Sequence, residues 1–203
     1  MKIDKYEKIK ESMYRLYLDN GEVIDTYDDV ILDNDLLLKK EITPSIYNSI
    51  MYENRIQELC NSCIKYISYR LRSTKEIRDY LKKKDASSEE IEVVINILNK
   101  KKVLNDELFC ECFIKDKMRF TSMGKYRIIK ELQSHNISND IIDKYISLMD
   151  DGAVIEKIEK LVDKKIRSNH KLDNYKLRDK IYYNLINLGY PSDLVVKVLN
   201  NKF

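Results

Sequence analysis

The chain has 203 residues, of which 43% are hydrophobic and 35% are charged, so it is long enough and apolar enough to bury a core. It contains only four glycines and two prolines, and this scarcity of chain breakers predicts a mainly α-helical protein. No apolar run approaches the length of a membrane span, and the N-terminus lacks a signal-peptide core. We therefore expect a cytoplasmic protein with reduced cysteines.

The net charge of +3 is unevenly distributed along the chain. Residues 1–54 hold 7 basic and 12 acidic side chains, a net of −5, whereas residues 55–203 hold 30 basic and 22 acidic side chains, a net of +8. A basic body favours a polyanionic partner, although a solvated lysine-rich surface would give the same numbers.

Residues 2–27 predict a small antiparallel β element. Polar and apolar residues alternate from Met13 to Leu18, and Asn20-Gly21 then gives the strongest short hairpin signal, because both residues tolerate positive φ. Val23 to Tyr27 is the expected return strand. Two or three strands are not stable alone in water, so this element must pack on another part of the chain. A short helix is expected within residues 28–38.

A long helix is predicted to begin at Thr43-Pro44, where threonine is a suitable N-cap and proline suits the first helical position. Helical periodicity continues to about Leu71, and a break near Asn54 is left open.

Two capping boxes of the S-x-x-E type mark the next helix starts. Ser73 and Glu76 open a helix over residues 74–83, and Ser87 and Glu90 open another. Caps, turns and apolar periodicity predict further helices that contain residues 109–118, 126–133, 141–149, 154–166, 177–185 and 194–199.

The helical part repeats itself. A shift of 51 residues places Ile77 on Ile128, and a further shift of 53 places Ile128 on Ile181. The turns Ser87-Ser88-Glu89, Ser138-Asn139-Asp140 and Pro191-Ser192-Asp193 then fall in equivalent places. This self-similarity predicts three tandem three-helix repeats that stack into an elongated, curved body with an extended binding surface. The expected divisions are an acidic, β-rich extension at 1–42 and repeats at 43–102, 103–150 and 151–203.

Two cysteine pairs resemble half-sites for zinc. Cys60 and Cys63, and likewise Cys110 and Cys112, fall inside predicted amphipathic helices at or beside core-facing positions. We interpret them as small buried residues of a helix seam, because cysteine is among the most buried residue types. The alternative zinc site would require both pairs to converge.

No residue set supports catalysis. Neither His135 nor His170 lies in a metal-binding or triad pattern, and both are expected to be ordinary surface or loop residues. No phosphate loop, nucleophile elbow or tuned carboxylate pair is recognisable, so we predict no enzyme activity, no metal and no cofactor. The 15 tyrosines suggest base stacking, but many are expected at core-edge positions of helices.

The basic residues near the middle helix of each repeat are the informative set. Stacked repeats would bring them onto neighbouring parts of one surface, which could follow a nucleic-acid backbone or an acidic protein groove. A scattered solvated face is the alternative. The three groups are Arg70, Arg72, Lys75 and Arg78; Lys125, Arg127 and Lys130; and Lys176, Arg178 and Lys180.

Three motifs in combination resemble the signature of the RecX family of recombination regulators. They are Y-R-L-R-S-x-x-E-I-x-x-Y-L at 69–81, V-L-N-D-E-x-F at 103–109, and G-K-x-x-I-x-x-E-L at 124–132. The resemblance covers residues 55–150 well and the rest more loosely. The chain departs from the family pattern at Cys60 and Cys110, where alanine is common, and at Asn136, where glycine is usual.

The resemblance implies a monomeric, non-enzymatic modulator of the RecA recombinase. Such proteins bind RecA filaments on single-stranded DNA along the helical groove. They inhibit filament growth, ATP hydrolysis, strand exchange and the coprotease activity behind the SOS response, and so act in DNA recombination and repair. Single-stranded DNA is a further candidate partner. The alternative is a direct DNA-binding protein that uses helix-turn-helix-like three-helix units.

Overall fold

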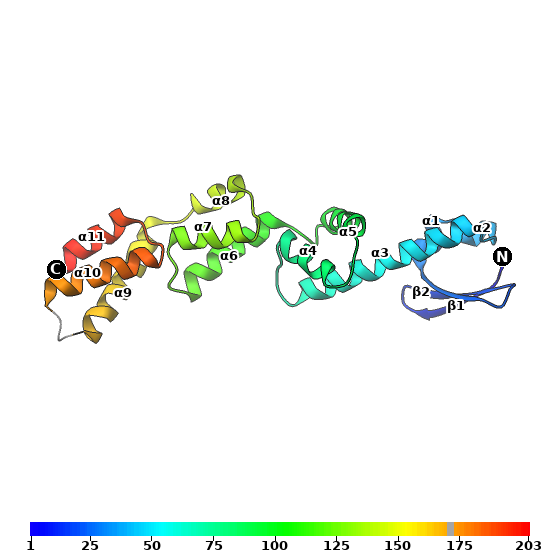
Figure 1. Ribbon diagram of the computed structural model, residues 1–203, viewed down its shortest axis with the longest axis horizontal. Helices are drawn as coiled ribbons and strands as arrows, with labels where there is room; N and C mark the ends of the chain where they lie inside the picture. Colours follow the sequence, from blue (N-terminus) through cyan, green and yellow to red (C-terminus); the bar gives the residue numbers. More distant parts are fainter. Residues whose placement is uncertain (170–172) are drawn as a thin grey trace. The chain divides into compact units, whose positions relative to one another are not determined.

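The computed structural model describes residues 1–169 and 173–203, and His170 with its predicted loop position lies outside them. The described chain divides into two compact units, Met1–Arg70 with Ile77–Val103 and Leu71–Glu76 with Leu104–Phe203. Its helices and strands are shown in Figure 1 and are β1 (Ile3–Lys10), β2 (Met13–Leu18), β3 (Val23–Tyr27), α1 (Asp28–Asp33), α2 (Leu36–Lys39), α3 (Pro44–Ser68), α4 (Thr74–Lys82), α5 (Ser88–Lys100), α6 (Asp106–Phe120), α7 (Lys125–Ser134), α8 (Asn139–Ile146), α9 (Asp151–Ser168), α10 (Asn174–Asn187) and α11 (Ser192–Lys202). No helix in the described part of the chain combines the length and apolar character that a membrane crossing needs.

The N-terminal β element is a three-stranded antiparallel sheet in the order β1-β2-β3. The predicted hairpin joins β2 to β3, with Gly21 at φ +86° in the turn and the Asn20 side chain accepting a 3.1 Å hydrogen bond from the Glu22 N–H. In the register of this hairpin, Leu16 lies opposite Ile24. The first strand, which belongs to the same predicted β element, pairs with β2 along most of its length.

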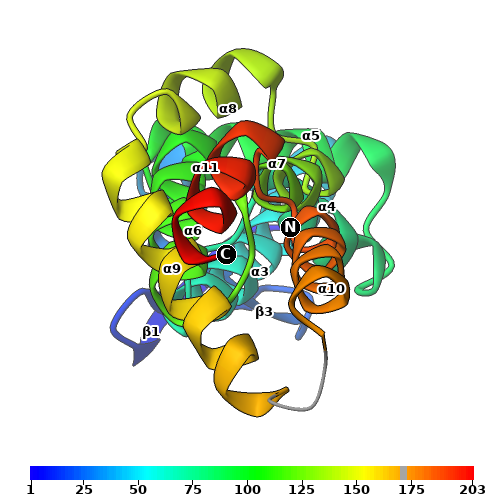
Figure 2. The ribbon, with the colours of Figure 1, turned by 90° about the vertical axis from the view of Figure 1, so that its left-hand side faces the viewer.

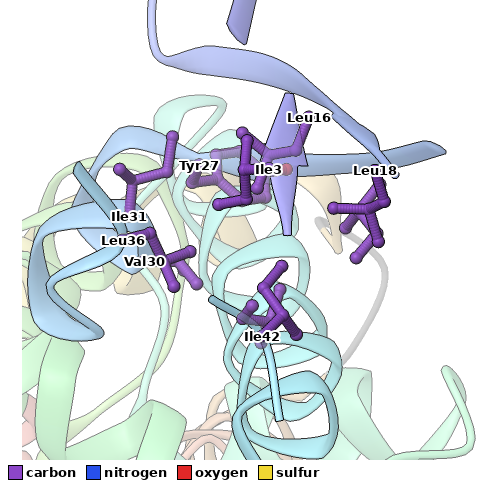
Figure 3. Packing of buried hydrophobic residues seen from close by; sticks show 10 residues of the cluster. Ile3, Leu16, Leu18, Tyr27, Val30, Ile31, Leu36 and Ile42 are labelled. Carbon is purple, nitrogen blue, oxygen red and sulfur yellow. The ribbon is translucent and has the colours of Figure 1, made fainter. Parts of the chain in front are cut away.

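One face of the sheet packs on helices, as an element of this size requires. Figure 3 shows Leu16 and Leu18 of β2 gathered with Val30 and Ile31 of α1 around a common core, and all four side chains are buried. Ile50 of α3 belongs to the same cluster. The sheet is therefore anchored to the long helix through apolar burial.

Helix α3 runs unbroken for 25 residues, so no break occurs near Asn54. Thr43 caps it as predicted, with its hydroxyl accepting from the Ile46 N–H at 3.3 Å. Asn54 is buried, and its side chain forms two hydrogen bonds with β3. Its Oδ1 accepts from the Thr26 hydroxyl at 2.8 Å, and its Nδ2 donates to the Asp25 carbonyl at 3.0 Å. A polar residue that looked like a helix break is thus a buried polar link.

The apolar repeat positions are core positions. In the second repeat, residues of α6, α7 and α8 form a buried cluster that includes Ile128 and Leu132. In the third repeat, α9, α10 and α11 pack against one another (Figure 2), and their buried cluster includes Ile181 and Leu185. Ile77, equivalent to Ile128, is also fully buried. The chain is mostly helical, with three-helix repeats after a small sheet, as the sequence predicted.

The turn that ends each middle helix repeats as well. Asp85, Asn136 and Gly189, which the shifts of 51 and 53 residues superpose, have φ values of 56°, 55° and 89°. Each is followed by an amide that bonds back to a buried leucine carbonyl, from Ala86 to Leu81, from Ile137 to Leu132 and from Tyr190 to Leu185. This is the left-handed helix ending that glycine favours and that Asn and Asp tolerate. This turn therefore accommodates Asn136, at the position where the sequence resemblance leads us to expect glycine.

We predict that Asn54→Ala lowers the free energy of unfolding of the N-terminal unit by about 1–3 kcal/mol, because it leaves the buried Thr26 hydroxyl without its acceptor. Amide hydrogen exchange of β3 measures the loss. The matched control is Asn61→Ala, at an exposed position of the same helix, which should leave exchange unchanged. Equal exchange in both variants would contradict the proposed role of Asn54.

Candidate interaction surface

The first predicted basic group surrounds the start of α4. Ser73 is buried and forms the predicted capping box, with its hydroxyl accepting from the Glu76 N–H at 3.2 Å and its own N–H donating to the Glu76 carboxylate at 3.1 Å. The Arg72 guanidinium lies 3.3 Å from the same carboxylate, and only 13% of the Arg72 side chain is exposed. Arg72 therefore contacts the helix cap through Glu76, and little of its side chain is available to a partner.

The start of α4 also contacts the second repeat. The Thr74 N–H donates to the Asp106 carboxylate at 2.8 Å, and the Ser73 hydroxyl lies 3.5 Å from Nδ1 of His135. The His135 ring packs on Phe109 with 5.2 Å between ring centroids. His135 lies in the turn between α7 and α8, so it is a loop residue as the sequence suggested, but it is half-buried and makes these two contacts.

Arg78, the last member of the first group, is held by a carboxylate on the next helix. Both guanidinium NH₂ groups donate to the two Glu92 oxygens, one of them at 2.8 Å, and this pairing raises the pKa of Arg78 and lowers that of Glu92. Arg70 is exposed after α3, and Lys75 is half-buried in the first turn of α4. The placement of this group beside the other two stays a prediction.

The second basic group lies on α7. Arg127 and Lys130 are exposed and Lys125 is half-buried, and none of the three is in ion-pair contact with a carboxylate in the described part of the chain. The nearby Glu131 is neutralised by Lys117, whose Nζ lies 2.8 Å away. Two cations on this helix therefore reach solvent without an acidic neighbour that compensates them.

A close approach of two glycines joins the start of α7 to the end of α10. The Gly124 N–H donates to the Leu188 carbonyl at 2.7 Å, and the Tyr126 N–H donates to the Gly189 carbonyl at 2.9 Å. A Cβ on Gly124 would lie 2.4 Å from the Gly189 carbonyl carbon, and one on Gly189 would lie 2.5 Å from the Arg127 nitrogen. Only glycine fits at both positions, so this contact fixes the second repeat against the third.

The third basic group lies on α10, and its members point to different neighbours. Arg178 donates to the Asn200 side chain on α11 at 2.9 Å, whereas Lys180 reaches the Asn169 side chain beyond α9 at 3.4 Å. Lys176 is exposed near the helix start. The 53-residue shift places Arg127 on Lys180 and Lys125 on Arg178, so the second and third repeats carry cations at equivalent positions.

Two adjoining grooves hold some of the predicted cations: Arg127 and Lys130 of the second group line one, and Lys180 of the third group lines the other. A groove of about 590 Å³ is lined by residues of α7 and the end of α10, and one of about 300 Å³ lies between α9 and α10. Both include Asn187, so they meet at the end of α10. We call their shared surface the basic groove face, and its polar and aromatic residues are Tyr126, Arg127, Lys130, Glu131, Ser134, Lys165, Asn169, Lys180, Tyr183, Asn184 and Asn187.

Sequence reasoning missed the tyrosines of this face. Tyr126 is 59% exposed and Tyr183 is 66% exposed, although many tyrosines were expected at core-edge positions. Each stands two residues from a buried isoleucine on its helix, Ile128 for Tyr126 and Ile181 for Tyr183. Side chains two residues apart lie on opposite sides of a helix. The positions of the apolar residues along each helix could therefore have predicted that both tyrosines are exposed.

The cysteines lie where their helical positions predicted. Cys60, Cys63 and Cys110 are buried, and Cys112 is half-buried. Burial raises the pKa of Cys63 to about 12 and that of Cys110 to about 11, so both thiols are protonated at neutral pH. Among the residues that the structure describes, no three His, Cys, Asp or Glu side chains gather in a metal-binding cluster.

Comparison with known proteins identifies the family. Models of the first, second and third three-helix domains of RecX match residues 61–98, 105–146 and 153–199. The regulatory protein RecX of Streptococcus uberis is 35% identical over 202 residues, which are 99% of this chain and 77% of that protein. The chain belongs to the RecX family. The regulatory protein RecX of Listeria monocytogenes serotype 4a is another relative, 30% identical over 95% of this chain and 71% of its own length.

Solved RecX structures share the fold. A crystal structure of a regulatory protein RecX superposes with a TM-score of 0.90 at 20% identity and covers 98% of both chains. The RecX structure from Lactobacillus salivarius gives a TM-score of 0.68 at 25% identity, over 72% of this chain and 95% of that one. The three-helix repeats seen here are therefore the RecX architecture.

We predict that Gly124→Ala and Gly189→Ala each lower the free energy of unfolding by about 1–3 kcal/mol, because a Cβ at either position overlaps backbone atoms of the other repeat. Urea denaturation measures the change.

Gly152→Ala is the matched control for these two variants. Its Cβ would meet only the Asp150 side chain at 3.1 Å, inside the first turn of α9. It should change the free energy of unfolding by less than about 1 kcal/mol, because the helix preference of alanine offsets the small shift required of the Asp150 carboxylate. A Gly124→Ala variant as stable as Gly152→Ala would contradict the glycine contact.

Proposed function

We propose that this chain is a non-enzymatic regulator of the RecA recombinase. It binds RecA filaments on single-stranded DNA in the cytoplasm and inhibits their growth, ATP hydrolysis, strand exchange and SOS coprotease activity. Membership of the RecX family supports the regulatory role, because relatives carry the name regulatory protein RecX. The observation that carries the proposal for this chain is the basic groove face, where two consecutive repeats present cations at equivalent positions.

The physical argument rests on periodicity and charge. A recombinase filament repeats one protomer along its length, so a protein built from repeats can make similar contacts with successive protomers. Arg127, Lys130 and Lys180 supply charge for acidic groups of such a partner. Arg127 and Lys130 form no ion pair in the described part of the chain, because Glu131 of the same groove is paired with Lys117. No residue of the face needs to act as an acid, a base or a nucleophile.

The test is inhibition of RecA ATPase activity on preformed RecA–single-stranded-DNA filaments. The unmodified chain should inhibit at near-stoichiometric amounts. We expect Arg127→Glu/Lys130→Glu/Lys180→Glu to raise the half-inhibitory concentration by roughly tenfold or more, because like charges brought together at an interface cost several kcal/mol.

The matched control is Lys10→Glu/Lys83→Glu/Lys100→Glu, which makes the same charge change at exposed positions outside the basic groove face. Circular dichroism should show equal helicity in both triple variants. Absence of inhibition by the unmodified chain would refute RecA regulation, and equal inhibition by the two variants would place the contact elsewhere.

Direct DNA binding is the second candidate, and the exposed Tyr126 and Tyr183 favour it. Exposed aromatic rings beside cations are the combination that binds single strands, because bases stack on the rings while phosphates pair with lysine and arginine. The helix-turn-helix-like interpretation differs, since it requires duplex DNA and some sequence preference.

We predict that Tyr126→Ala weakens binding of a fluorescent oligothymidylate, without RecA, by about 1–3 kcal/mol if a base stacks there. Tyr175→Ala, at a 72% exposed position of α10 outside the grooves, is the matched control and should have no effect. If the chain contacts three phosphates, the logarithm of the binding constant should fall with the logarithm of the salt concentration with a slope of about −2. Equal affinity in both variants would count against this candidate.

A further inference from the structure

The N-terminal unit carries an apolar groove that no part of the described chain fills. It has a volume of about 230 Å³ and lies where the inner face of the sheet extends past α1 and α2. Its lining residues, here called the N-terminal groove, are Tyr6, Tyr14, Asp28, Ile31, Leu32 and Leu37.

Backbone pairing explains why the two tyrosines face the helices. Tyr6 lies opposite Leu16, and Tyr14 stands two residues from Leu16 on the same strand, so all three point to the core side of the sheet. Leu16 is covered completely, whereas Tyr6 and Tyr14 are only half-buried. The Tyr6 hydroxyl donates to the Leu36 carbonyl at 2.7 Å, which holds α2 beside the groove.

The exposed leucines beside the groove are unusually concentrated. Leu32 is 61% exposed, Leu37 is 53% exposed, and the adjacent Leu38 is 85% exposed. These three lie within seven residues of one another, next to an open apolar pocket. Scattered surface leucines need no explanation, but apolar residues gathered around a concave site mark an interaction surface.

The charges around the groove indicate the chemistry of its occupant. Residues 28–38 carry four carboxylates and no cation. Asp35 pairs with Lys39 at 3.2 Å, whereas Asp28, Asp29 and Asp33 have no cationic partner among the ion pairs of the described residues. On the opposite side, Lys8 lies 6.0 Å from the centre of the Tyr14 ring. Asp28 lines the groove itself, and α1 carries Asp29 and Asp33 but no cation. The α1 side of the groove is therefore acidic, and it complements a basic ligand.

We propose that the N-terminal groove binds a basic amphipathic helix of a partner protein. The groove is smaller than the roughly 300–1,000 Å³ of small-molecule pockets, so it suits one or two apolar side chains of a peptide better than a whole cofactor. Apolar anchors of the bound helix enter the groove between Tyr14 and Leu37, and its lysines or arginines face Asp28 and Asp33. This binding is independent of the basic groove face and of RecA regulation.

Synthetic peptides added to the full chain test the proposal. The probe is an 18-residue amphipathic helix of leucine and lysine, compared with a leucine–glutamate helix of the same pattern and with a scrambled leucine–lysine sequence. NMR spectra of isotope-labelled protein should show the leucine–lysine helix shifting signals of Tyr6, Tyr14 and Leu37. The other two peptides should leave those signals unchanged.

Variants locate the site. Leu32→Ser/Leu37→Ser should weaken binding by roughly tenfold, because two apolar contacts are lost. Asp28→Asn/Asp33→Asn should weaken it by roughly threefold to tenfold at low salt and less at high salt. Val23→Ser removes a 50% exposed apolar residue of β3 outside the groove and should have no effect.

Three results would overturn the proposal. They are equal binding of the leucine–glutamate helix, unchanged affinity in both double variants, and signal shifts confined to other parts of the chain. Self-association of the unliganded chain that Leu32→Ser/Leu37→Ser abolishes would also overturn it, because the occupant would then be a second copy. All these readouts are made without RecA, so failure here leaves the RecA proposal unaffected.

Discussion

The middle helix of each repeat, α4, α7 or α10, is followed by a turn that contains a residue with left-handed backbone. The contact between the second and third repeats depends on this turn. Gly189 occupies the turn in the third repeat and receives the start of α7 at Gly124, backbone against backbone. In the second repeat the equivalent turn holds Asn136, and its neighbour His135 contacts Ser73. One local conformation thus serves both to end a helix and to receive the start of another. Because the glycine contact sets how α7 meets α10, it also determines that Arg127 and Lys130 of α7 line one groove with Asn187 of α10.

Much of the fold was predictable because its signals are local. The capping boxes at Ser73 and Ser87 depend on side chains three residues apart, and both form as expected. The repeat was visible because buried positions such as Ile128 and Ile181 recur at nearly constant spacing. The hairpin at Asn20-Gly21 was predictable for the same reason, since its turn chemistry is contained in two residues.

What the sequence did not predict depends on partners that are distant along the chain. Asn54 resembled a helix break, and only its contacts with Asp25 and Thr26 make it a buried link. Arg78 resembled a free surface cation, but Glu92 on the next helix holds it. Residue type alone could not separate such paired cations from those of the basic groove face. The face itself arises where two repeats meet, so no single stretch of sequence describes it.

The central claim is that the basic groove face attaches this RecX-family chain to RecA filaments. Co-sedimentation with RecA–single-stranded-DNA filaments tests it most directly, because it measures attachment without assuming any effect on ATP hydrolysis. The unmodified chain should sediment with filaments to saturation, and it should stay in the supernatant when Arg127, Lys130 and Lys180 are all changed to glutamate. A charge-reversed chain that still sediments to the same extent, or an unmodified chain that does not sediment, would contradict the claim.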